Sequence, residues 1–338
     1  MPSSYNVHLV VPSNRLDGLC AFFTAWAEKD VWRKIHLVYD NPMPVPLSKL
    51  LDQLNARGTE VGTYGWEQVD ALPHRDREIF SRRDSAVRCF GFLKAFQDGA
   101  DFVVTLDDDC FPTPHQTPFE FMYSHLTAFS GTRRWESTVP GAHVRGLPYK
   151  NKGMAEVDVS MGLWTKVADL SAPEQLVRAD RGEPLDVPLP AGRRMMPRGQ
   201  YFPLCGMNLA FTRRATPLMY FPPMGEGRPY SRFDDIWAGV VAQKVMAHLG
   251  WNWTCGEPHV VHQRASDPVA NLVKEAPGIA ANEQFWELID GVKLTADTAV
   301  SAVAEIGEAL ARMSGAGLNT YLGAWGRGLL GWSRLLGG

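Results

Sequence analysis

Short runs of apolar and β-branched residues alternate with segments of helical spacing along the first third of the chain. The runs at 7–11, 35–39 and 102–106 predict buried strands, because turn-forming or polar residues follow each of them. Apolar residues recur at helical intervals in three further segments, 16–29, 47–54 and 81–97. Strands that alternate with helices predict an α/β fold with a parallel sheet.

The strand predicted at 102–106 ends at three consecutive acids, Asp107, Asp108 and Asp109. Buried carboxylates need a neutralising charge, and carboxylate oxygens suit Mn²⁺ or Mg²⁺. In open α/β sheets the ligand lies beyond the carboxyl ends of the strands. We therefore predict a metal site here that neutralises a diphosphate, and the alternative is an acidic turn on the surface.

Groups suited to a nucleotide accompany the other predicted elements of this region. Asp40 follows the second predicted strand, where an acid can accept hydrogen bonds from a base or a ribose. Asp84 and Arg88 are four residues apart, so we expect them to share a face of the helix predicted at 81–97. A plain turn acid and a solvated ion pair are the alternatives.

The second half of the chain places further candidates at the ends of predicted elements. A buried strand is predicted at 201–211, in which Gly206 would let a ligand or another backbone approach closely. Asp234 and Asp235 begin a predicted helix, where acids either cap the helix or face a cleft. His262 ends a predicted strand, and the alternative there is a core histidine.

Four later segments are read from pattern alone. A strand leading into a basic turn is predicted at 144–153, and its three cations could close over phosphates. The mixed segment 271–290 carries Lys274 as its notable cation, and 296–313 has the spacing of a helix. The apolar tail 325–336 contains several glycines, and we favour packing within the chain or between subunits over a membrane surface.

Composition excludes several classes of protein. The chain has 34 Lys and Arg against 37 Asp and Glu, so nothing global favours nucleic acid as a partner. Its five cysteines lack paired spacing, which indicates neither a zinc site nor a disulfide framework. No signal peptide and no apolar run of membrane-spanning length is recognised, so we expect a soluble cytoplasmic protein without an integral membrane segment. Peripheral membrane association through the tail is the alternative.

Several separated blocks resemble, in order, the reversibly glycosylated polypeptide family, the UDP-arabinopyranose mutases best known from plants. The blocks lie at 83–91, 105–111, 144–146, 162–164, 172–177, 202–211, 232–239 and 262–275. The resemblance implies a GT-A-like glycosyltransferase fold with a mostly parallel central sheet flanked by helices. It implies a UDP-sugar-binding catalytic domain over 1–290, and an Ala- and Gly-rich helical extension over 291–338 lies outside it.

The resemblance also implies roles for individual residues. Asp107, Asp109 and His262 would bind the metal. The nucleotide would contact Pro12, Asp40, Asp84, Arg88, Asp107, Asp108, Trp164, Gly206, Asn208 and Lys274. Asp234 and Asp235 would face the sugar, and Arg145 would reach the diphosphate or the sugar.

One position departs from the family pattern. An arginine in the loop after the 144–146 block carries reversible self-glycosylation in the plant family, and ungapped counting places Lys152 there. Lysine keeps the charge but lacks the planar guanidinium. The departure weakens the expectation of self-glycosylation and of ring isomerisation, and the alternative is that Lys152 only contacts phosphate.

The activity that the resemblance implies is a Mn²⁺- or Mg²⁺-dependent interconversion of UDP-arabinopyranose and UDP-arabinofuranose. Cleavage at the anomeric carbon leaves an oxocarbenium-like sugar and an anionic diphosphate, so positive charge belongs beside the diphosphate and negative charge beside the sugar. The same groups would serve a glycosyltransferase that moves the sugar to an acceptor hydroxyl. A non-catalytic UDP-sugar-binding subunit is the third interpretation, and a homo-oligomer stays open.

Overall fold

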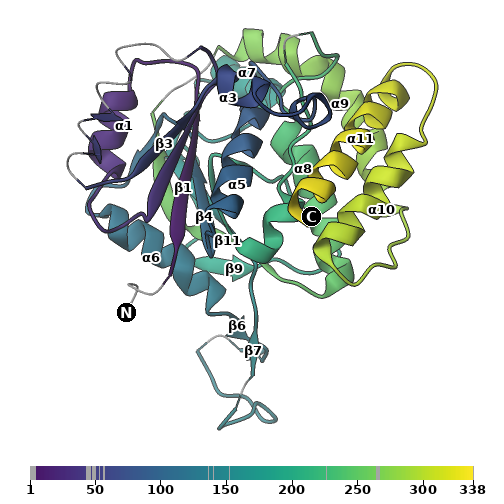
Figure 1. Cartoon of the computed structure of the whole chain (residues 1–338). Helices are drawn as coiled ribbons and strands as arrows, with labels where there is room; N and C mark the ends of the chain where they lie inside the picture. Colours follow the sequence, from purple (N-terminus) through teal and green to yellow (C-terminus); the bar gives the residue numbers. More distant parts are fainter. Residues whose placement is uncertain are drawn as a thin grey trace.

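The three apolar runs predicted as strands lie side by side near one end of a β-sheet in the computed structural model (Figure 1). The structure describes residues 5–42, 47, 51–52, 54–55, 58–135, 137–139, 141–151, 153–225, 227–263 and 267–337. Nine described strands form the sheet: β1 (Val7–Ser13), β2 (Lys34–Tyr39), β3 (Val61–Tyr64), β4 (Phe102–Leu106), β5 (Cys110–Pro112), β8 (Val159–Lys166), β9 (Arg193–Met195), β10 (Asn208–Thr212) and β11 (Trp253–His262). Their order is β3-β2-β1-β4-β10-β8-β11-β5, and β9 pairs with β11.

Strand direction brings several chain segments to one edge of the sheet. β1 is parallel to β2 and β4, and β2 is parallel to β3. β10 runs antiparallel between β4 and β8, and β8 is parallel to β11. The carboxyl ends of β1, β2, β4, β8 and β11 therefore share one edge, where β10 begins. The parallel sheet predicted from the N-terminal strands is present there, and the sheet becomes mixed beyond β4.

Helices cover both faces of the sheet. The described α-helices are α1 (Leu19–Trp26), α3 (Trp66–Asp70), α4 (His74–Arg77), α5 (Arg88–Gln97), α6 (Pro118–Phe129), α7 (Ala172–Arg181), α8 (Asp234–Leu249), α9 (Pro268–Asp290), α10 (Ala299–Ala311) and α11 (Leu318–Gly337). α1 and α6 lie on one side, where the ring centroids of Trp26 and Phe121 are 4.6 Å apart (Figure 1). α5 and α8 lie on the other side (Figure 1). The expected α/β class with a GT-A-like arrangement is confirmed.

Two predicted strands differ from the structure. The run at 201–211 forms a strand only from Asn208, because Pro203 and Gly206 interrupt it. The strand predicted to end at His262 is β11, which begins at Trp253. Residues 144–151 form turns and bends in a segment that projects from the body between β6 (Thr132–Arg133) and β7 (Met154–Ala155) (Figure 1). The helix predicted at 47–54 lies largely outside the described residues.

The C-terminal segment packs inside the chain. Gly307 of α10 and Gly326 of α11 face each other, and a Cβ at Gly326 would overlap the backbone N of Ala311. Trp332 is 0% exposed, packs on Tyr220 and donates to Pro217 O at 3.2 Å. Intrachain packing of the tail, one of the two arrangements we favoured, is therefore observed. A domain boundary at 290 stays a prediction.

Candidate active site

Two connected cavities open at the edge where the carboxyl ends of the strands meet. The first, of about 390 Å³, lies at the ends of β1 and β4 and is lined by Pro12, Asp40, the acid triplet Asp107–Asp109 and Lys274 among others. The second, of about 440 Å³, extends toward the start of α8 and is lined by Asp169, Asp234 and Asp235 among others. Six residues line both cavities, namely Arg83, Asp84, Ser85, Arg88, Asp107 and Arg232. We call the two together the cleft.

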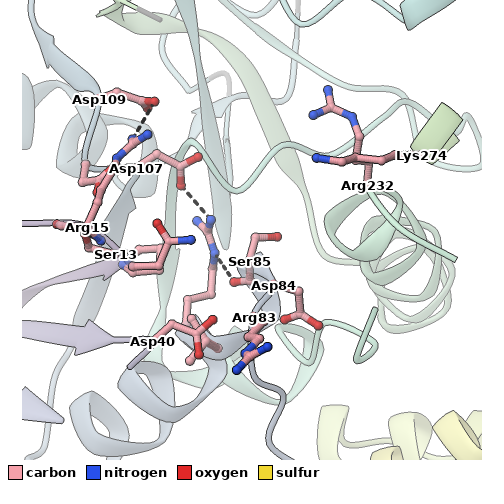
Figure 2. Close-up of a pocket in the computed structure, with 15 residues that line it drawn as sticks. Ser13, Arg15, Asp40, Arg83, Asp84, Ser85, Asp107, Asp109, Arg232 and Lys274 are labelled. Atoms are coloured by element: carbon pink, nitrogen blue, oxygen red, sulfur yellow. Dashed lines mark hydrogen bonds and ion pairs between the residues drawn. The ribbon is translucent and has the colours of Figure 1, made fainter. Parts of the chain in front are cut away.

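Two arginines pair with the acid triplet, and Figure 2 shows Arg15 against Asp109. Asp107 Oδ1 accepts from Arg88 Nη2 at 2.6 Å. Asp108 accepts from Ser13 Oγ at 2.5 Å and from Arg15 Nε at 3.1 Å, and Asp109 Oδ2 accepts from Arg15 Nη2 at 2.8 Å. The acids therefore end a buried strand as predicted, but protein guanidinium groups already balance much of their charge.

Arg88 is a buried cation at the centre of the cleft, with only 2% of its surface exposed. Its donors reach Ser85 O at 2.9 Å, Gly206 O at 2.5 Å and Thr105 Oγ1 at 3.3 Å as well as Asp107. Asp107 and the neighbouring acids hold the pKa of Arg88 above its usual range, although burial opposes them. Arg88 thus fixes the position of Asp107 and leaves little donor capacity for a diphosphate.

The predicted helical pair of Asp84 and Arg88 is wrong in its geometry. Asp84 is the N-cap of a single 3₁₀ turn (Ser85–Val87), has extended backbone angles and accepts from Ala86 N at 2.9 Å. Its carboxylate also accepts from Met224 N at 2.7 Å and from Ser81 Oγ. Arg88 begins the following helix α5 and points to Asp107 instead. A local capping bond takes the place of the expected shared helix face because the α-helix starts only after Asp84.

Gly206 connects Arg88 with the start of α8. Its carbonyl accepts from Arg88, and its N–H donates to Asp235 Oδ2 at 3.0 Å. A Cβ at this position would lie 2.8 Å from Arg88 Nη1. The close approach predicted for Gly206 is therefore made by a guanidinium group of the protein.

Carboxyl groups with raised pKa values line the second cavity. Burial, with the nearby charge of Asp234, raises the pKa of Asp84 and of Asp235 to about 8. Burial also raises the pKa of Asp234, whose carboxylate accepts from Ser85 Oγ. Carboxyls of this kind can exchange protons near neutral pH.

Cations stand across the first cavity from the acid triplet. Figure 2 shows Arg232 and Lys274, which both line this cavity, across from Asp107, Asp109 and Arg15. Arg232 Nε donates to Glu275 Oε1 at 2.9 Å, and Lys274 comes from the exposed side of α9. At the far end of this cavity Asp40 accepts from Trp66 Nε1 at 2.9 Å, and burial raises the pKa of Asp40.

The predicted metal ligands come together only in part. His262 Nε2 lies 3.8 Å from Asp109 Oδ1, and its Nδ1 donates to Val167 O at 3.1 Å, which leaves Nε2 directed toward Asp109. Within the described ranges, three or more His, Cys, Asp or Glu side chains do not converge on one point as a ready metal site. Asp109 and His262 still fit Mn²⁺ or Mg²⁺, because these ions are commonly held by few protein groups together with phosphate oxygens and water.

Among the described residues, five predicted site residues do not line the cleft. Gly206 and His262 contact residues that do, Arg88 and Asp109, and the other three are Asn208, Trp164 and Arg145. Asn208 is 0% exposed and is occupied by His125, Leu163 O and Pro258 O, so it is a core residue. Trp164 is buried in β8 and lines neither cavity. Arg145 is exposed on the segment that projects between β6 and β7, at the edge opposite the carboxyl ends of the strands (Figure 1). The described geometry therefore does not support a diphosphate contact for Arg145, and Lys152 lies outside the described residues.

Arg15 is the main functional candidate that the sequence did not indicate. It follows the turn that ends β1, and it contacts two of the three acids. Its partners lie more than 90 residues away along the chain, so the sequence does not show the contact. Ser85 and Glu275 were missed for the same reason, since their partners Asp234 and Arg232 are also distant in sequence. The one available signal is position, because residues just past a parallel strand face the ligand edge.

The sheet order and the charged cleft at its carboxyl edge define a GT-A-like α/β protein. The chain belongs to the reversibly glycosylated polypeptide family, whose model matches residues 3–335. This match confirms the resemblance and extends it into α11.

Named relatives agree with this placement. "Probable UDP-arabinopyranose mutase 1" of Pisum sativum is 33% identical over 253 residues, which are 71% of this chain and 67% of that protein. "UDP-arabinopyranose mutase 3" of Arabidopsis thaliana is 34% identical over 247 residues, 68% of this chain and 64% of that protein. The chain thus spans about two thirds of the length of these relatives. The prediction of an enzyme family is confirmed by their names.

A solved structure, S. aureus TarS 1–349 in complex with UDP, is 10% identical with a TM-score of 0.44, and the match covers 98% of this chain and 90% of that chain. That likeness is too distant to inform the function. None of the described helices combines the length and apolar character that crossing a bilayer requires.

Proposed function

We propose that this chain is a UDP-sugar enzyme that interconverts UDP-arabinopyranose and UDP-arabinofuranose with Mn²⁺ or Mg²⁺ as cofactor. The names of its relatives support this substrate. The observation that carries the proposal is the division of the cleft into two cavities that meet at Arg88 and Asp107. A nucleoside diphosphate fits the first cavity and its sugar the second.

The first cavity offers contacts for each part of the nucleotide. Asp40 lies at the end of β2 with an acceptor for a base or ribose hydroxyl. Lys274 and Arg232 supply positive charge opposite the acid triplet, where the diphosphate would lie. Asp109 and His262 would hold the divalent cation, which supplies charge that stabilises the diphosphate as a leaving group.

The second cavity suits a sugar that changes its ring form. Exchange of the ring requires the attacking hydroxyl to lose a proton as it bonds to the anomeric carbon, and the former ring oxygen to gain one. Asp84 and Asp235, whose pKa values burial raises to about 8, can give or take this proton near neutral pH. An ionised Asp234 would stabilise positive charge on the sugar.

The test is incubation of the full chain with UDP-arabinopyranose and Mn²⁺, followed by chromatography of the nucleotide sugars. A new UDP-arabinofuranose peak is expected. Asp109→Ala should abolish it, whereas Asp180→Ala, which removes an exposed acid of α7 outside both cavities, should leave it unchanged.

Other outcomes decide between the alternatives. Hydrolysis or an acceptor adduct without the furanose form would favour a glycosyltransferase. Binding of UDP without any product would favour a non-catalytic subunit. A gain of one pentose in the protein mass would establish self-glycosylation, and peptide mapping would show whether Lys152 carries it.

A further inference from the structure

Arg15 holds two carboxylates of the acid triplet in different ways. Its Nε and Nη2 engage both oxygens of Asp108, with Nε at 3.1 Å from Oδ2. The same Nη2 reaches Asp109 Oδ2 at 2.8 Å. Ser13 Oγ also donates to Asp108, so three donors hold this carboxylate in place.

The contact of Arg15 with Asp108 is more buried than its contact with Asp109. The Asp108 side chain is 7% exposed, that of Asp109 is 20% exposed and that of Arg15 is 29% exposed. The bidentate pair with Asp108 is therefore the inner, stronger contact. The single bond to Asp109 lies toward the cleft, and Asp109 also faces His262.

The positions of these groups create a competition. A divalent cation on Asp109 and His262 must take the carboxylate that Arg15 now neutralises. Arg15 would stay anchored to Asp108 and keep its charge at the wall of the first cavity, which it lines. Its Nη1 has no hydrogen-bond partner among the described residues, so it can donate to an anionic ligand.

We propose that Arg15 is a built-in counter-ion of Asp109 that a divalent cation displaces, and that the freed donors then bind the diphosphate. Asp108 is thereby a positioning residue for Arg15 and not a metal ligand. This inference rests on the proposed function. It predicts that the cation binds weakly alone and more tightly with nucleotide. The cation must displace Arg15 from Asp109, and a bound diphosphate offsets this cost by accepting hydrogen bonds from the displaced Arg15.

The test measures Mn²⁺ binding by the loss of the free-ion electron paramagnetic resonance signal, and UDP binding by calorimetry. Arg15→Met should raise the affinity for Mn²⁺ in the absence of nucleotide about tenfold or more, because a charge-assisted hydrogen bond no longer competes. The same variant should lower the affinity for UDP in the presence of Mn²⁺ by about tenfold. Arg15→Lys should fall between, since lysine cannot form the bidentate pair.

The control is Arg312→Met, which removes an exposed arginine paired with Glu308 on α10 and changes the net charge equally. Neither affinity should change in this variant. The opposite signs expected for Arg15→Met exclude misfolding as the cause, because misfolding lowers both affinities. Where Arg15→Met fails to fold, as judged by circular dichroism, Arg15→Lys must show a several-fold rise in Mn²⁺ affinity.

Two results overturn the inference. The first is a Mn²⁺ affinity of folded, nucleotide-free Arg15→Met that is unchanged or lower than that of the wild-type chain. If the wild-type chain still binds UDP with Mn²⁺, this result shows that Arg15 does not compete with the cation. Wild-type protein that binds neither UDP nor UDP-arabinopyranose overturns the proposed function as well. The wild-type measurements therefore separate the two failures.

Discussion

Replacing Arg88 by Met removes the buried cation that fixes Asp107 while keeping an unbranched apolar side chain in place of the aliphatic stem. The variant leaves Gly206 O without the donor that now lies 2.5 Å away, whereas Ser85 O still accepts from the backbone N–H of residue 88. It also leaves Asp107 without its partner at 2.6 Å, although that side chain is 32% exposed and can be solvated by water.

The expected loss follows from these contacts. Removing one member of a buried ion pair costs about 3–5 kcal/mol, and the unsatisfied buried carbonyl of Gly206 costs about 1–3 kcal/mol. Relief from burying the guanidinium itself and partial exposure of Asp107 offset part of this sum. We expect Arg88→Met to lower the free energy of unfolding by about 3–5 kcal/mol.

Urea titration followed by tryptophan fluorescence measures this loss. Arg15→Met is the matched comparison, since Arg15 contacts the same triplet but its side chain is 29% exposed against 3% for Arg88. Its loss should stay below about 2 kcal/mol. A loss for Arg88→Met no larger than that for Arg15→Met would refute the reasoning. Additive losses in a cycle with Asp107→Asn would refute the ion pair itself, for which a coupling of about 1–3 kcal/mol is expected.

Three further outcomes are expected. Gly206→Ala places a Cβ 2.8 Å from Nη1 of Arg88 and should lower the free energy of unfolding by about 1–3 kcal/mol in the same urea titration. An unchanged free energy of unfolding would mean that the Arg88 side chain is not held in place. Trp332→Ala should cost about 3–5 kcal/mol because the ring is 0% exposed, and a loss under about 1 kcal/mol would contradict the packing of α11. Burial raises the pKa of Asp235 from 3.8 to about 8, so wild-type stability should fall as pH rises through that window, where the unfolded chain alone releases the proton. Asp235→Asn should therefore gain stability relative to wild type by at most about 1.4 kcal/mol per pH unit, and equal differences in melting temperature at pH 5 and pH 8 would contradict this sign.

The central strands were predictable because their signal is local. The apolar runs at 7–11, 35–39 and 102–106 match β1, β2 and β4 to within two residues. Parallel pairing of these strands then places Asp40 and the acid triplet at one edge, as expected. Periodicity and turn residues are sufficient for such elements.

The partners of the acids were not predictable, because they depend on tertiary packing. Arg15 and Arg88 lie 94 and 19 residues from the carboxylates they contact at Asp109 and Asp107. Asn208 and Trp164 belong to matching sequence blocks, but a linear pattern does not show which side of a strand faces the cleft. The glycines of α11 lowered its helix propensity, yet Gly326 permits the close contact with α10 that stabilises the helix.

The charges along the cleft support cleavage of a bond between its two cavities. The lining of the first cavity contains five Arg and Lys side chains and five Asp side chains. That of the second contains three Arg side chains against five Asp and one Glu. Under the proposed function, a sugar that develops positive charge is stabilised in the second cavity, where acids outnumber arginines. A diphosphate in the first cavity, where acids and basic residues are equal in number, needs further positive charge. The raised pKa values of Asp84 and Asp235 keep part of the acidic wall neutral near pH 7, which limits the repulsion of the anionic substrate as it enters. The requirement for positive charge beside the diphosphate is what links Arg15 and a divalent cation to the same step.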